Sequence, residues 1–257
     1  MFVRFRRQLS VLALAIIAGA CGSDSTGPTD YPPATLDQAL AELSIPALSA
    51  GGTSYVEVGD GAPSLDPTTC PYSAAVQSFV CTPISQSGIT VNQSFTLFNA
   101  SGGKQGAFDP ASTNSVRANS TVAGTLVDQG TSVTVNGQQE LTLSGLISGP
   151  HVLNGTSSIS LAGTVADGTG SYPVNITVST TIANLVLPPH ATASADIWPS
   201  SGKITVEVNG SIGPLSLNSA RTTITFTGTS TVDVTVSGGG LSKSCKVNLA
   251  VAEPVCA

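Results

Sequence analysis

Charged and aromatic residues are scarce in this sequence, and the shortage of basic residues excludes one class of function. Of its 257 residues, 9% are charged and 5% are aromatic, and the formal net charge is −6. Three of the nine basic residues lie within the first seven positions, as Arg4, Arg6 and Arg7. The net charge of the remaining chain is therefore more negative than −6. Such a chain lacks the basic cluster that releases counterions on binding nucleic acid. Anionic headgroups would also repel it, so any membrane attachment must have another source.

Catalytic motifs are missing as well. The sequence has no G-x-S-x-G elbow, H-E-x-x-H helix, P-loop or dinucleotide fingerprint. The only histidines, His151 and His190, each follow a proline, which predicts turns instead of a catalytic site. We therefore predict a protein without enzymatic activity. Paired carboxylates that hydrolyse a glycan cannot be recognised without a structure, so a hydrolase of envelope polymer stays an open alternative.

No cofactor and no metal site are predicted. The loop that holds Asp60 and Asp66 lacks the alternating oxygen ligands of a calcium loop. The C-x2-C spacing of zinc sites is absent, and neither histidine is near a cysteine. Glu207 and Asp233 lie between Val and Thr residues, which indicates carboxylates on a solvent-exposed strand face.

The one long apolar run lies at the N-terminus. Residues 9–18 are predominantly apolar, follow the three early arginines and end in the small residues before Cys21. A basic start, a short apolar stretch and small residues before a cleavage point are typical of a secretory signal.

The end of this run resembles the lipobox of bacterial lipoproteins. Gly19, Ala20 and Cys21 match its common form, while Ala18 replaces the usual leucine. The resemblance, which covers residues 1–28, implies cleavage before Cys21, a diacylglyceryl group on its sulfur and acylation of the new amino terminus. Gly22 stands where aspartate would retain such proteins in the inner membrane, so the resemblance favours the outer membrane or cell surface. Lipid on Cys21 is then the expected link to the membrane.

The signal-like N-terminus and the composition of the rest of the chain together predict three segments. Residues 1–20 form the signal peptide, residues 21–34 a flexible tether rich in Ser, Thr, Gly and Pro, and residues 35–257 a single all-β domain. One short helix is expected at the start of that domain. Thr35 and Gln38 form a capping box, and Leu36, Ala39, Leu40 and Leu43 share one apolar face.

Period-two alternation of apolar and polar residues predicts the strands. Ile89, Val91, Phe95 and Leu97 alternate with polar residues, and similar patterns recur to the C-terminus. We expect an antiparallel meander of roughly ten strands that forms a barrel-like or sandwich domain. Asn136-Gly137 predicts a hairpin turn, and residues 238–240, all glycine, predict another.

Four cysteines remain after Cys21, an even number in an exported chain. Three pairings are possible, but two local pairs share the spacing C-x10-C, and short loops close at the lowest entropic cost. We predict disulfides between Cys70 and Cys81 and between Cys245 and Cys256.

Five strands place glycine in phase with their apolar residues: Gly124, Gly145, Gly163, Gly210 and Gly228. Three interpretations follow, namely a row that lets the sheet coil, a seat for the predicted helix, or a groove for an elongated apolar ligand. The single tryptophan, Trp198, is expected to pack in the core or at a corner, with stacking on a glycan as the alternative.

These features predict a lipid-anchored envelope protein with a non-catalytic binding or structural β domain. A barrel that carries an apolar molecule is the main alternative. A glycan, a protein and an apolar ligand all remain open as partners.

Overall fold

The computed structural model describes residues 70–128, 130–167, 170–187, 198–217, 219–249 and 253–256. The predicted signal peptide, tether and helix, together with Cys21, Asp60, Asp66 and His190, lie outside these residues.

The described residues form fifteen strands and no helix, which confirms the prediction of an antiparallel all-β fold. The strands are β1 (Tyr72–Ser73), β2 (Ser78–Val80), β3 (Ile84–Gln86), β4 (Ile89–Asn99), β5 (Lys104–Gln105), β6 (Thr113–Asp128), β7 (Thr131–Ser144), β8 (His151–Asp167), β9 (Gly170–Leu187), β10 (Ser201–Ile212), β11 (Leu215–Ser216), β12 (Ala220–Phe226), β13 (Thr231–Gly238), β14 (Leu241–Asn248) and β15 (Glu253–Cys256).

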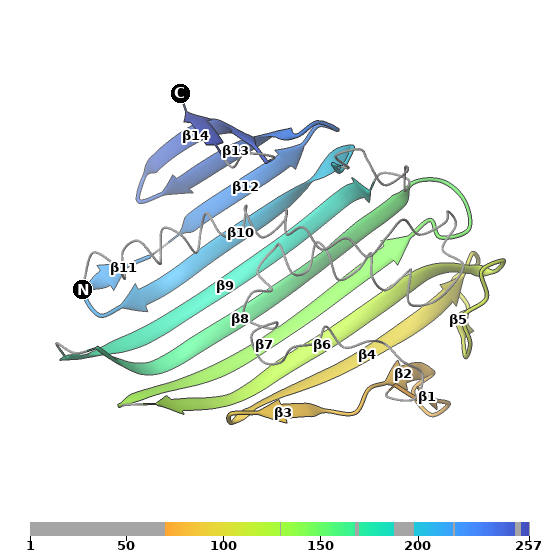
Figure 1. Cartoon of the computed structure of the whole chain (residues 1–257), viewed down its shortest axis with the longest axis horizontal. Helices are drawn as coiled ribbons and strands as arrows, with labels where there is room; N and C mark the ends of the chain where they lie inside the picture. The colour runs from red at the N-terminus through yellow and green to blue at the C-terminus, as the bar shows by residue number, and fades with distance from the viewer. Residues whose placement is uncertain are drawn as a thin grey trace.

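All fifteen strands belong to one open sheet. Its order is β1-β2-β4-β6-β7-β8-β9-β10-β12-β13-β14-β15, with β3 and β5 also pairing with β4, and β11 with β10. Figure 1 shows β1 to β3 and β14 at opposite margins of the sheet. A barrel requires its first and last strands to pair, so the predicted barrel is wrong. The described strands also do not divide into the two sheets of the predicted sandwich.

Short strands at both margins explain why the sheet stays open. Strands β1, β2 and β3 have two or three residues each, and β15 has four. By contrast, β6 to β9 in the middle have 14 to 18 residues. Neither margin therefore offers a long strand with which the other could close a barrel.

Of the two predicted turns, one is absent and the other is present. Asn136 and Gly137 lie within β7 and pair with β6 on one side and β8 on the other, so the predicted hairpin turn is wrong. Two long ladders outweigh the local preference of Asn-Gly for a turn. The glycine turn at residues 238–240 is confirmed between β13 and β14.

The sheet has two chemically different faces. Paired residues on neighbouring strands point to the same side, so the register defines an inner face that carries most of the apolar residues and an outer face that carries most of the polar ones. The main core lies on the inner face and at the adjoining ends of the strands. Its buried members include Phe95, Leu97, Val116, Leu141, Leu143, Leu153, Ile182, Leu185, Ile204, Ile224, Val232 and Val234.

The five in-phase glycines all adopt a positive φ. At Gly210, where φ is 131°, an added Cβ would overlap the carbonyl oxygen of Asn175 on the neighbouring strand. At Gly163, where φ is 152°, it would overlap that of Ser132. L-residues with a side chain rarely adopt this conformation, so glycine lets the backbones approach closely here. This geometry agrees with the interpretation that the glycines let the sheet coil, although the sheet does not close.

Replacing Gly210 by alanine should lower the free energy of unfolding by about 2–4 kcal/mol, because the methyl group meets backbone and the φ angle is strained. Gly102→Ala is the matched control, since Gly102 also has a positive φ of 81° but has no atom within 4 Å of the added Cβ. The control should cost only about 1 kcal/mol. Urea unfolding of both variants measures the difference, and equal losses would contradict the close approach of the strands.

Candidate functional site

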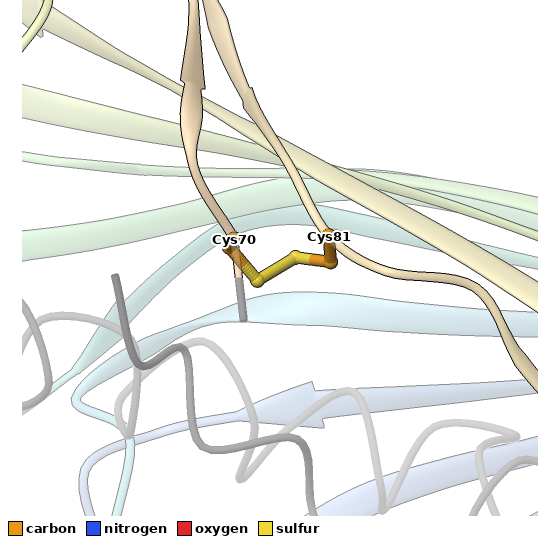
Figure 2. The surroundings of a disulfide bond; sticks show 2 residues. All are labelled: Cys70 and Cys81. Atoms are coloured by element: carbon orange, nitrogen blue, oxygen red, sulfur yellow. A yellow bond between two sulfur atoms is a disulfide. The ribbon is translucent and has the colours of Figure 1, made fainter. Parts of the chain in front are cut away.

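Both predicted disulfides are present. Cys70 bonds to Cys81 and Cys245 bonds to Cys256, each with a sequence separation of 11. Figure 2 shows the Cys70–Cys81 bond joining the two chain segments that lead into and out of the β1–β2 hairpin. The other bond joins β14 to β15 at the opposite margin, where the two cysteines are register partners. Each disulfide therefore fastens one margin of the sheet.

Aromatic packing reinforces the first margin. The ring of Phe79 on β2 stacks on that of Phe95 on β4, with centroids 4.5 Å apart and planes 3° apart. Tyr72 on β1 contacts Phe79 edge-on at 5.2 Å. Because Cys70, Phe79 and Cys81 all belong to the main core, the disulfide and the rings hold the β1–β2 hairpin against β4 together.

The outer face is dominated by uncharged polar residues. One row of paired residues crosses nine strands and contains a single charge, on Glu140: Ser94, Asn119, Glu140, Thr156, Thr181, Thr205, Thr223, Thr235 and Ser244. Glu207 and Asp233 also lie on this face, and each forms an ion pair with a basic residue on the neighbouring strand. Glu207 lies 3.4 Å from Arg221, and Asp233 lies 2.7 Å from Lys246. Both pairs are exposed, which confirms the expected solvent-facing carboxylates and limits the stability that each pair adds to about 1 kcal/mol or less.

A row of uncharged polar side chains interrupts the inner face. Successive strands β4, β6, β7, β8 and β9 pair these residues directly with one another. We call this set the polar row; it consists of Gln93, Ser120, Gln139, Ser157 and Thr180. On one side of it lies the main core, and on the other lies a smaller cluster formed by Ile89, Val91 and Val122 with Val135 packed against it.

Side-chain hydrogen bonds are sparse at Gln93, Ser120, Gln139 and Ser157 within the described residues. Ser120 Oγ donates to Gln139 Oε1 at 3.4 Å. No side-chain hydrogen bond of Gln93 or Ser157 occurs within the described part of the chain. Thr180 is buried, whereas the other four side chains are partly exposed. The row thus presents amide and hydroxyl groups that solvent or a ligand can reach.

The neighbourhood of the polar row carries no charge. On the inner face from β4 to β10, the row and the nearest row of paired residues on each side of it contain no Asp, Glu, Lys or Arg. The sequence alone did not reveal the row as a site. Each strand shows one polar residue in phase with its apolar ones, but only the register aligns the five.

His151 and Trp198, two further residues considered in the sequence, are both at least partly buried. His151 begins β8 and is 2% exposed, so it lies in a strand instead of the predicted turn. Trp198 is partly buried against the main core, which confirms the packing interpretation. Among the described residues, no group of three or more His, Cys, Asp or Glu side chains is arranged to hold a metal ion.

Comparisons with known proteins yield no relative. No family model matches the chain, and neither does any curated protein or solved structure. In the part of the chain that the structure describes, no helix is long and apolar enough to cross a membrane.

One carboxylate has a perturbed acidity. Asp109, in the turn before β6, accepts hydrogen bonds from Ser112 Oγ at 2.6 Å and from the amide of Ala111 at 3.0 Å. These bonds, that of Ser112 first, hold the pKa of Asp109 below its usual value. A lowered pKa in the folded state stabilises the fold above the unfolded-state pKa, and this contribution is lost as the pH falls through the folded-state value.

Replacing Asp109 by alanine should therefore destabilise the protein at neutral pH and matter progressively less as the pH falls below about 4. Unfolding midpoints measured between pH 7 and pH 3 test this, and Ser112→Ala should reproduce part of the effect. A gap between wild type and Asp109→Ala that stays constant down to pH 3 would show that the carboxylate charge is not what matters.

Removing the second disulfide through the double substitution Cys245→Ser and Cys256→Ser should lower the free energy of unfolding by about 3 kcal/mol. It should also promote association, because β15 would no longer be tied over the edge of β14. Urea unfolding and size-exclusion chromatography measure the two effects, with the exposed neighbour Ser244→Ala as the control. A double variant that is as stable as the control would contradict a structural role for this bond.

Proposed function

We propose that this chain is an exported lipoprotein, held in the cell envelope through lipid on Cys21, whose sheet is a non-catalytic binding or structural domain. The observation that carries the proposal is the pair of disulfides formed by both C-x10-C segments. Disulfides persist in non-reducing compartments, so the folded domain belongs to one. The export signal predicted at the N-terminus supplies a route to that compartment.

The distribution of polar groups on the outer face supports a structural role for the domain. Glu207 and Asp233, the carboxylates expected on a solvent-exposed strand face, are each paired with a basic residue on the outer face. A disulfide cross-links each margin of the open sheet, and the outer face carries mainly Ser, Thr and Asn. A polar surface of this kind, together with protected sheet margins, limits aggregation, which suits a protein anchored on a membrane and exposed to solvent.

Carriage of an apolar ligand is the second candidate. It is favoured by the half-buried aliphatic side chains of Leu161, Val178 and Val208 on the inner face beyond the polar row. Because the sheet is open, the ligand would lie on a face instead of inside the barrel expected from the sequence.

The anchor is tested by Cys21→Ser in the full-length protein expressed in its own host. We expect the variant to lose incorporation of radiolabelled palmitate and to keep its signal peptide, because no thioether can form at serine. Gly22→Asp is the matched control, which should still incorporate the label but shift towards the inner membrane in a host with two membranes. Palmitate incorporation that survives Cys21→Ser would overturn the anchor.

A further inference from the structure

We propose that the polar row and the aliphatic positions beside it bind an uncharged acyl lipid. The hydroxyl, ester or amide groups of the lipid would hydrogen-bond the polar row, and its hydrocarbon chain would lie along the aliphatic positions. This inference rests on the proposed binding function and names the ligand class for the inner face.

The row has the shape required for an elongated ligand. Its five residues are direct register partners, so they form a line across β4, β6, β7, β8 and β9. Neighbouring strands lie about 4.8 Å apart, and the line is therefore about 19 Å long. An extended chain that crosses the strands can contact its four partly exposed members, Gln93, Ser120, Gln139 and Ser157.

The row also has hydrogen-bonding capacity to offer. A glutamine amide has two donors and an acceptor, yet within the described residues the side chain of Gln139 makes one hydrogen bond, accepted from Ser120 at 3.4 Å. Gln93 and Ser157 make no side-chain hydrogen bond within the described residues. Polar groups between two apolar clusters are costly unless they find partners. Uncharged polar groups of a bound lipid would supply them.

The electrostatics of the face select an uncharged ligand. The row and its neighbours on either side carry no Lys or Arg from β4 to β10. A carboxylate or phosphate placed there would lose hydration without gaining a counter-ion, which is strongly unfavourable. Hydroxyl, ester and amide groups avoid that penalty.

The adjoining surface favours hydrocarbon over sugar rings. The next row of paired residues on the inner face begins in the smaller cluster and contains only aliphatic residues and glycine: Val91, Val122, Gly137, Ile159, Val178 and Val208. Val178 and Val208 also pack against the main core. This aliphatic row contains no aromatic ring on which a sugar could stack. Ile159 is 8% exposed, while Val178 and Val208 are more open. An acyl chain can cover these side chains and remove their remaining apolar surface from water.

The experiment compares two probes that share the same acyl chain but carry different head groups, one an uncharged glyceryl ester and the other a carboxylate. The purified full-length protein is titrated with monopalmitoylglycerol and with palmitate, and native mass spectrometry counts the bound molecules separately from any covalent lipid. We expect monopalmitoylglycerol to bind with at least tenfold higher affinity than palmitate. Equal binding of the two probes would overturn the argument from charge, and so would preference for palmitate.

Two adjacent glutamines provide the matched variants. Gln139 belongs to the polar row, whereas Gln138 is exposed on the outer face. Gln139→Leu should weaken binding of monopalmitoylglycerol about fivefold through loss of hydrogen bonds, and Gln138→Leu should leave it unchanged. If Gln139→Leu does not fold, Ser157→Ala and its outer-face neighbour Ser158→Ala give the same comparison.

Equal affinities in the two glutamine variants would overturn the inference, because the row would then bond only within the protein. The absence of binding by either probe to the wild-type protein would also overturn it. Neither result bears on the anchor, which palmitate incorporation into Cys21 tests separately.

Discussion

An open sheet exposes unpaired backbone groups at both margins, and this constraint shapes most of the structure. Such margins invite other chains to pair with them. Here each margin is covered by short strands, and one disulfide fastens the cover in each case. The Phe79–Phe95 stack adds a second tie at one side only. Because both disulfides need oxidised cysteines, the covering of the margins depends on the compartment in which the protein folds.

The middle of the sheet meets a different constraint, because strands of up to 18 residues must twist without breaking their ladders. Glycines with a positive φ relieve it. Gly163 and Gly210 bring their backbones against neighbouring carbonyl groups where any side chain would intrude. A sheet that bends at such points can bury its inner face more deeply than a flat one. This agrees with the complete burial of Leu143 and Leu153 on that face.

The sequence allowed accurate prediction wherever the information is local. Alternation with a period of two identified the inner face of β4, and the spacing C-x10-C identified both disulfides. Features that depend on distant pairing escaped it. Asn136-Gly137 has strong turn propensity, but two flanking ladders absorb it into β7. Barrel closure likewise depends on whether the two margins meet, which no single strand pattern records.

The polar row shows the same limit in the part of the molecule that we propose to bind a ligand. Along the inner-face positions of β7, Gln139 is one polar residue between Gly137 and Leu141, and the strand alone does not mark it as part of a site. Register aligns it with Ser120 on one side and Ser157 on the other, and a line emerges across the face. The row separates the smaller cluster of Ile89, Val91 and Val122 from the main core on β4 and β6, whereas Val206, the register partner of Thr180 on β10, belongs to the main core. This alignment of uncharged polar side chains is the observation on which the proposed binding role of the inner face rests.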